Sequence, residues 1–218
     1  GTGGGGRLTI GMSGPGKTLV IACGAIAREL VRIRERNGWD HVEFQCLPAE
    51  LHNRPDSIPA AVRNEVQRHR AEFDRIFVAY ADCGTGGGID KVLEEEGVQR
   101  LPGAHCYQFF AGAARFDALA DAEPGTFYLT DFLVRHFERL VIKGLAMDRS
   151  PQLIPEYFGN YRRLVYLAQT ESEELQALAR EHARFLGLEF HYHYCGDEPL
   201  AGSLSPSLGK AVRSGGVF

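Results

Sequence analysis

The chain has 218 residues, of which 44% are hydrophobic and 24% charged, and its formal net charge is −4 at pH 7. This composition predicts a globular protein of one large domain or two small lobes, and the acidic balance gives no electrostatic basis for binding nucleic acid or an anionic membrane. No apolar run reaches the roughly 18 residues that a membrane span needs, and no signal-peptide pattern opens the chain. We therefore expect a cytoplasmic protein whose five cysteines are free thiols or metal ligands.

The glycine-rich start of the chain contains the segment GMSGPGKT, which begins at Gly11. Its Gly16, Lys17 and Thr18 stand where the phosphate-binding loop of nucleotide hydrolases has them. Such a loop opens a helix, whereas the residues that follow, Leu19–Ala22, have the character of a strand. A flexible leader to the first strand is the favoured interpretation, and a phosphate-binding loop is the alternative.

Apolar runs and helical periodicities alternate along the rest of the chain. The expected strands are Leu19–Ala22, Val42–Cys46, Arg75–Ala81, Val98–Leu101, Phe127–Leu129, Arg163–Ala168 and Glu189–Tyr194. The expected helices are Gly24–Asn37, Ala60–Phe73, Ile89–Glu96, Gln108–Ala120, one capped by Thr130 and Asp131, and Thr170–Leu186. This alternation predicts an α/β fold, a three-layer domain of the Rossmann-like or flavodoxin-like type with a mostly parallel sheet.

The pattern also indicates how the chain is divided. Residues 1–18 are expected to form the flexible leader, and residues 19–196 a single α/β domain. The clearest turn is Glu123-Pro124-Gly125, so a division of this domain into two lobes would fall near 123–126. Residues 197–218 are rich in glycine, serine and proline, and we expect them to form a loosely ordered tail.

Three cysteines, Cys23, Cys83 and Cys106, each follow a predicted strand or turn beside a glycine or a Pro-Gly pair. Open α/β sheets present their chemistry at the carboxyl ends of strands, so we expect these thiols to converge. Three thiolates with the imidazole of His52 would make a tetrahedral zinc site, and three thiolates with an open position would hold an iron–sulfur cluster. Whether His52, His105 or an exogenous ligand completes the site stays open.

Two carboxylates adjoin these predicted ligands. Asp82 precedes Cys83, and Glu50 lies two residues before a histidine, so either could act as a catalytic acid or base or orient a ligand. Capping of the glycine loop that follows is the slightly favoured role for Asp82. The loop itself is a candidate for cofactor binding through its backbone amides, with Gly84, Gly86 and Gly87 as the candidate residues.

The cysteines also have a purely structural interpretation, because cysteine is a small residue that is commonly buried. Cys46 lies in an apolar run and is expected in the core, whereas Cys195 is assigned equally to core and site. His191 and His193 alternate with tyrosines on a predicted strand, which is interpreted as a polar sheet face.

Six segments together resemble one protein family. They are IACGAIAREL, CLPAELHNRP, YADCGTGG, GAHCYQFFAG, FYLTDFLVRHF and YFGNYRRLVYLAQ, and the resemblance runs from about Leu19 to Gly196. The family is the bacterial and archaeal domain of unknown function that is number sixteen thirty-eight in that series. The resemblance implies a setting beside corrinoid-dependent methyltransferases that act on methylamines or betaines. It places the predicted metal ligands within the family's motifs and does not extend to GMSGPGKT.

Together these observations predict a metal-dependent enzyme, a transferase or lyase, with Cys23, Cys83 and Cys106 as ligands. Zinc or an iron–sulfur cluster would act as a Lewis acid on a small-molecule substrate, with methyl or sulfur transfer in one-carbon or methylamine metabolism as the setting. The first alternative is a non-catalytic accessory protein that binds a metal or cofactor and serves a corrinoid protein or methyltransferase. The second alternative is a P-loop nucleotide hydrolase that uses Lys17, Thr18 and Asp82.

Overall fold

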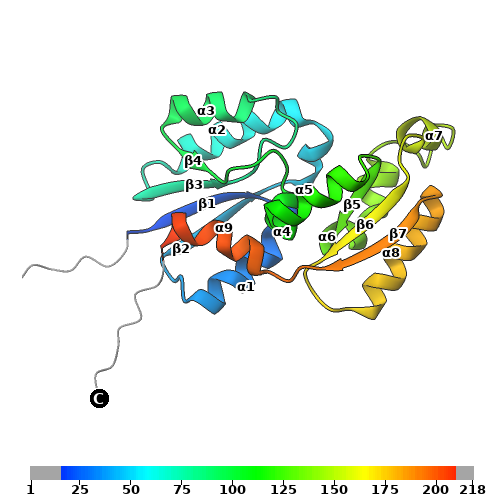
Figure 1. The fold of residues 1–218 in the computed structure, drawn as a ribbon. Helices are drawn as coiled ribbons and strands as arrows, with labels where there is room; N and C mark the ends of the chain where they lie inside the picture. The colour runs from blue at the N-terminus through cyan, green and yellow to red at the C-terminus, as the bar shows by residue number, and fades with distance from the viewer. Residues whose placement is uncertain (1–15, 210–218) are drawn as a thin grey trace, which may run out of the picture.

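Strands and helices alternate along the described chain, and the paired strands run parallel (Figure 1). The structure is a computed structural model that describes residues 16–209. It confirms the predicted α/β class, with parallel strands in a Rossmann-like arrangement. The strands divide, however, between a four-stranded and a three-stranded sheet, where we expected one. Gly11 and the rest of the predicted leader before residue 16, and the predicted tail from residue 210, lie outside the described residues.

The first sheet has the strand order β2-β1-β3-β4. Its strands are β1 (Thr18–Cys23), β2 (Val42–Leu47), β3 (Arg75–Ala79) and β4 (Gln99–Arg100). The order reverses at β1, which pairs with β2 on one side and with β3 on the other. Open α/β sheets bind their ligands at such a switch point, beyond the carboxyl ends of the strands. Every residue of β1 is buried, as expected for a central parallel strand covered on both faces.

Helices cover both faces of this first sheet. On one face, the apolar stripe of α1 packs against Val20 and Phe77, and on the other, α2 and α3 pack against Ile21 and Val78. The predicted helix at Gly24–Asn37 is present as a 3-10 turn that continues into α1. The bounds of these elements are Gly24–Ile26 for the turn, Ala27–Asn37 for α1, Ile58–His69 for α2 and Gly88–Glu96 for α3.

The second sheet has the order β5-β6-β7. Its strands are β5 (Thr126–Thr130), β6 (Arg163–Ala168) and β7 (Glu189–Tyr194). One face packs on α6 (Asp131–Arg135), the π-helix η4 (Glu138–Lys143), α7 (Leu153–Phe158) and α8 (Glu173–Leu186). The other face packs on Phe116 of α5 (Ala113–Ala122). Within residues 16–209, no helix has the length and apolar character needed to cross a membrane.

A glycine separates two short helices, of which the first contacts the cores of both sheets and the second packs on the second sheet. We predicted one helix over Gln108–Ala120, but the structure has α4 (Tyr107–Ala111) and α5 on either side of Gly112, whose φ is 81°. Phe110 packs in the core of the first sheet, whereas Phe116 packs on the second. Glycine reaches a positive φ without steric cost, so the break lets the chain serve both cores. We call residues 16–111 together with 197–209 the first lobe, and residues 112–196 the second lobe.

The predicted loosely ordered tail is wrong for residues 198–208, which form the helix α9 (Glu198–Leu208). This helix returns to the first lobe and lies beside α4, away from β7, which precedes it (Figure 1). Leu200, Leu204 and Leu208 are buried in the same core as Trp39. Proline, glycine and serine dominate the local sequence pattern, whereas the helix depends on leucines four residues apart that share one face.

The start of the described chain does not have the geometry of a phosphate-binding loop. Thr18 begins β1, so Lys17 and Thr18 lead into a strand where such a loop opens a helix. The Lys17 amine is exposed and lies 2.9 Å from a carboxylate oxygen of Glu43 on β2. This arrangement agrees with the favoured interpretation, in which the segment leads to the first strand.

Candidate metal centre

Cys83 and Cys106 are brought together by two backbone hydrogen bonds beyond the end of β3. The amide of Asp82 donates to the carbonyl of Gly103 at 3.1 Å, and the amide of Cys83 donates to the carbonyl of Ala104 at 3.0 Å. These bonds continue the pairing of β3 with the chain that follows β4. Cys106 therefore lies two residues beyond the hydrogen-bond partner of Cys83, although the two cysteines are far apart in the sequence.

The backbone of Cys83 is left-handed, with a φ of 51°. Residues other than glycine seldom adopt this region, because it brings Cβ close to the following carbonyl at a cost of roughly 1–2 kcal/mol. Conformations of this kind persist where the surrounding structure holds them, and they cluster at functional sites. The turn after β3 therefore fixes the Cys83 thiol in a position that a relaxed strand end would not give it.

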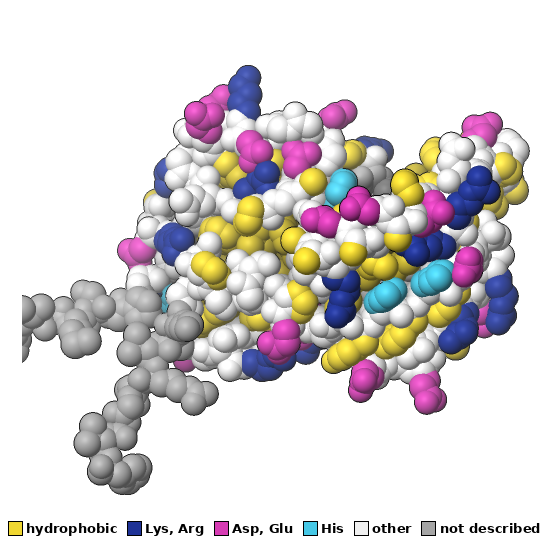
Figure 2. Space-filling model, in the orientation of Figure 1, with side chains coloured by type: hydrophobic (Ala, Val, Ile, Leu, Met, Phe, Trp, Pro, Cys, Tyr) yellow, Lys and Arg dark blue, Asp and Glu magenta, His cyan; other side chains and the backbone are white. Residues whose placement is uncertain are grey.

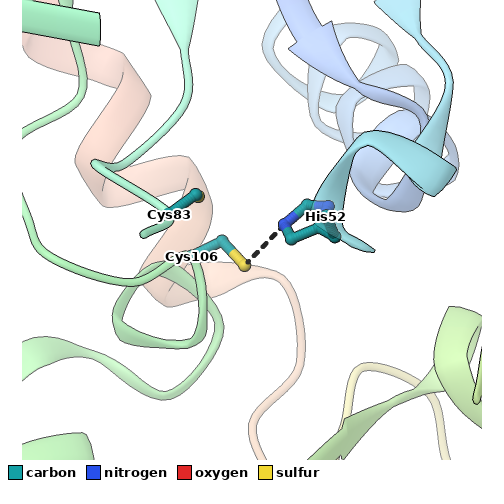
Figure 3. A group of neighbouring side chains, drawn as sticks. All are labelled: His52, Cys83 and Cys106. Carbon is teal, nitrogen blue, oxygen red and sulfur yellow. Dashed lines mark hydrogen bonds between the residues drawn. The ribbon is translucent and has the colours of Figure 1, made fainter. Parts of the chain in front are cut away.

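His52 completes a group of three side chains with Cys83 and Cys106 (Figure 3). It lies in the 3-10 helix η2 (Ala49–Asn53), which follows β2. The donor atoms of the three side chains lie within 4.8 Å of one another, and Cys106 Sγ is 3.8 Å from His52 Nε2. In a tetrahedral zinc site, bond lengths of about 2.3 Å to sulfur and 2.05 Å to nitrogen place those atoms about 3.6 Å apart. The group could therefore hold a metal ion with small movements.

Cys23 lies on the other side of the His52 ring. Its Sγ is 3.4 Å from Nδ1, whereas Cys106 Sγ is near Nε2. We predicted Cys23 as a metal ligand, but the two ring nitrogens point in different directions, so a metal bound to Nε2 is not shared with Cys23. With a metal on Nε2, the proton of the ring would be on Nδ1. The Nδ1–H group would then donate a hydrogen bond to Cys23 Sγ, which would fix the orientation of the ring.

Contacts within the group set its charges. Burial lowers the pKa of His52, but interactions with Cys23 and Cys83 outweigh burial and raise the pKa to about 10. The hydrogen bond from Cys106 lowers the pKa of Cys83, burial opposes it, and His52 assists it, which leaves a pKa of about 5. The same hydrogen bond, together with burial, raises the pKa of Cys106 well above its usual value. Without a metal, the group therefore pairs a thiolate with an imidazolium, and thiolate is the form of cysteine that binds metals.

A cavity of about 240 Å³ opens beside this group, between the two lobes. His52 and Cys106 line it from the first lobe. The second lobe contributes a mostly apolar wall, formed by Phe127, Thr130, Leu133, Leu140, Val141 and Leu145. We did not predict this wall; the available signal was that residues 132–141 carry apolar side chains on more than one helix face, whereas packing on one sheet needs a single stripe.

Neither predicted carboxylate lines the cavity. Asp82 accepts hydrogen bonds from Thr85 Oγ1 at 2.6 Å and from the amides of Gly86 at 3.2 Å and Gly87 at 2.8 Å. The Thr85 bond first, and then the amides, lower the pKa of Asp82. Asp82 thus caps the glycine loop in the structure, and both of its carboxylate oxygens accept hydrogen bonds from that loop. Glu50 is exposed and pairs with Arg139 of the second lobe, outside the cavity.

The glycine loop has a structural role in the described chain. Gly84, Gly86 and Gly87 have φ values of 81°, 61° and 84°, which favour glycine. The amides of the last two donate to Asp82, so they are not free to hold an anion in the way that we predicted. The loop instead carries the chain from the strained turn at Cys83 into α3.

The remaining cysteines and His105 do not join the donor group among residues 16–209. Cys46 packs against the first core, as predicted. Cys195 packs against Phe116 and its neighbours, and its thiol donates to the carbonyl of His193 at 3.6 Å. His105 is exposed.

The two histidines of β7 are partly exposed. Figure 2 shows histidine side chains next to hydrophobic ones on the face of the molecule that it draws. His191 Nε2 lies 2.9 Å from a carboxylate oxygen of Glu189. Burial, followed by the charge of Arg115, lowers the pKa of His193. The contact with Glu189 agrees with the predicted polar sheet face, whereas the residues paired with these histidines on β6, Val165 and Leu167, are buried and apolar.

Residues 46–198 match the protein family described as "Protein of unknown function (DUF1638)". The chain belongs to this family. The match covers more than half of the chain and includes His52, Cys83 and Cys106, while Cys23 precedes it. The family resemblance is thereby confirmed, and five of the six segments lie within the matched residues, whereas IACGAIAREL precedes them. No curated protein and no solved structure matched the chain.

Proposed function

We propose that His52, Cys83 and Cys106 bind one zinc ion and that this site acts on a small molecule. One observation carries the proposal: two of the three donors, His52 and Cys106, also line the cavity between the lobes. Structural zinc sites are closed by four protein ligands, whereas catalytic sites have three protein ligands and keep one position open. Three donors beside a cavity are the arrangement of the catalytic kind.

The types of donor favour zinc over an iron–sulfur cluster. A cluster with one free iron needs three thiolates, and the group offers two thiolates and an imidazole. The third cysteine nearby, Cys23, contacts the far nitrogen of the ring. Two cysteines with one histidine are a known ligand set for catalytic zinc.

Zinc bound here would supply a Lewis acid to a donor atom of the substrate. The residues of the chain would contribute position and surroundings. Cys23 would accept a hydrogen bond from the Nδ1–H group of His52 and so hold the ring in place. The left-handed turn would hold Cys83 in place. The apolar wall of the second lobe would keep water away from the reacting atoms. Methyl or sulfur transfer in one-carbon or methylamine metabolism, with a corrinoid protein or methyltransferase as partner, is the setting that we propose from the family resemblance.

A non-catalytic accessory protein is the alternative, and it would present the donor group on an exposed apolar surface. The donor group instead adjoins a cavity between the lobes, which favours the enzyme.

Metal and sulfide analysis of anaerobically purified protein, with an absorption spectrum, tests the proposal. We expect about one zinc per chain, and loss of that zinc in Cys83→Ser. Cys46→Ser is the matched control, because Cys46 packs against the first core outside the donor group, and it should retain the metal. About four irons with sulfide per chain would mean that the site holds an iron–sulfur cluster instead of zinc. Absence of metal from both the unaltered protein and Cys83→Ser would contradict the proposal.

A further inference from the structure

The cavity between the lobes is lined mostly by apolar side chains, with His52 and Cys106 at one end. We infer that it takes a small, largely apolar molecule that carries no charged group apart from one donor atom, held toward His52 and Cys106. This inference rests on the proposed zinc site and adds the class of molecule that the site would take.

The first argument is the absence of charge on the cavity walls. No Asp, Glu, Lys or Arg side chain among the described residues lines the cavity. Two of its polar side chains already have partners: Asn53 Nδ2 donates to the carbonyl of Leu140 at 3.1 Å, and Thr130 Oγ1 accepts from the amide of Leu133 at 3.4 Å. Away from His52 and Cys106, a carboxylate, phosphate or ammonium group would lose its water against these walls without meeting an opposite charge, which is costly.

The second argument is the apolar surface opposite the donors. Leu140 and Val141 of η4, with Leu145 just beyond it, line the cavity from the second lobe, and Phe110 of α4 lines it from the first. Each methylene group buried against such a wall strengthens binding about four-fold. The volume of about 240 Å³ lies below the roughly 300–1,000 Å³ of pockets for drug-sized molecules, so the occupant is small.

Cobalt-loaded full-length protein and a series of straight-chain thiols, from ethanethiol to hexanethiol, test the inference. Thiol binding to the metal is followed by the change in the cobalt absorption bands. We expect affinity to rise about four-fold with each added methylene until the cavity is full. We also expect 3-mercaptopropionate, which carries a carboxylate, to bind at least about ten-fold more weakly than propanethiol. Equal or tighter binding of 3-mercaptopropionate, or affinity independent of chain length, would overturn the inference.

The same experiment separates this inference from the proposed function. Thiolate-to-cobalt absorption before any thiol is added reports the metal site alone. If that absorption is missing, the proposed zinc site fails. If it is present and the thiol series shows no preference for apolar chains, the inference alone fails.

A pair of alanine variants locates the binding in the cavity. Ala25 lines the cavity, whereas Ala27 lies two residues further on, in a shallow surface groove with Val31. Ala25→Phe should weaken hexanethiol binding at least about ten-fold and leave the cobalt absorption in place, and Ala27→Phe should change neither. Unchanged hexanethiol binding in folded Ala25→Phe would place the binding elsewhere. If that variant does not fold, the thiol series on the unaltered protein decides.

Discussion

The Sγ atom of Cys23 lies 3.4 Å from Nδ1 of His52, so this cysteine contacts the ring nitrogen that is turned away from Cys106. In the zinc site that we propose, this contact makes Cys23 a partner of the ligand His52 instead of a ligand itself. Residues in that position orient the imidazole and raise its basicity, and their loss weakens metal binding about 10–100-fold.

We therefore predict that Cys23→Ala binds one zinc with an affinity reduced about 10–100-fold, whereas Cys83→Ser loses the metal. Competition with a chelator of known zinc affinity measures the difference. Cys195→Ala serves as the control, because its thiol contacts the carbonyl of His193 and lies outside the donor group. Loss of all zinc in Cys23→Ala would restore Cys23 as a ligand.

The lowered pKa of Cys83 predicts a reactive thiol in the metal-free protein. Only the thiolate is alkylated, so the rate of reaction with iodoacetamide should rise with pH through about 5 and be level by pH 7. Burial raises the pKa of Cys195, so this thiol should react slowly at pH 7. Mass spectrometry of the alkylated peptides follows both cysteines, and added zinc should protect Cys83. A half-maximal rate near the ordinary cysteine value, in the region of pH 9, would contradict the assignment.

Replacement of Asp82 should affect stability and leave metal binding intact. Asp82→Ala removes the acceptor for Thr85 and two glycine amides, and loss of a cap of this kind costs about 0.5–2 kcal/mol. Urea unfolding measures the free energy, and metal analysis of the same sample gives the zinc content. The exposed Asp56, changed to alanine, is the control. If Asp82→Ala had the stability of the unaltered protein but no enzymatic activity, the result would instead favour a catalytic role for the Asp82 carboxylate.

The second lobe depends on the buried carboxylate of Asp131. It accepts hydrogen bonds from the Tyr166 hydroxyl at 2.7 Å, the Gln169 amide at 3.0 Å, and the amide and hydroxyl of Thr170 at 3.1 and 2.6 Å. Asp131→Ala leaves these donors without a partner, so we expect a loss of at least about 2 kcal/mol in unfolding free energy. Asp121→Ala, on the exposed side of α5, should change it by less than about 0.5 kcal/mol. A small effect in Asp131→Ala would mean that water replaces the carboxylate.

Local patterns were sufficient to predict most elements but not the way they assemble. The strand at Arg163–Ala168 has the predicted bounds because a continuous apolar run marks a buried parallel strand. Phe127–Leu129 is similarly apolar, yet it begins a separate sheet, since pairing partners are chosen by contacts far apart in the sequence. The break at Gly112 could not be predicted for the same reason. The helical pattern continues through this glycine, and the need for a break follows only from the positions of the two hydrophobic cores on either side of it.

The candidate metal centre was predicted in part for a similar reason. His52, Cys83 and Cys106 are brought together because they follow strands or turns whose ends converge at one edge of the sheet. The separation of Cys23 from this group of three donors depends on which nitrogen of the His52 ring faces it, and spacing carries no information about ring orientation.

The return of α9 to the first lobe bears on how the protein is made. During synthesis β1 leaves the ribosome long before α9, so the core around Val20 and Trp39 lacks Leu200, Leu204 and Leu208 until the chain as far as residue 208 has emerged. The second lobe, from residue 112 to 196, leaves the ribosome before that core is complete. Until α9 packs, the first lobe therefore exposes apolar surface that is buried in the finished fold. Such surface is bound by chaperones and favours aggregation when the packing of α9 is delayed.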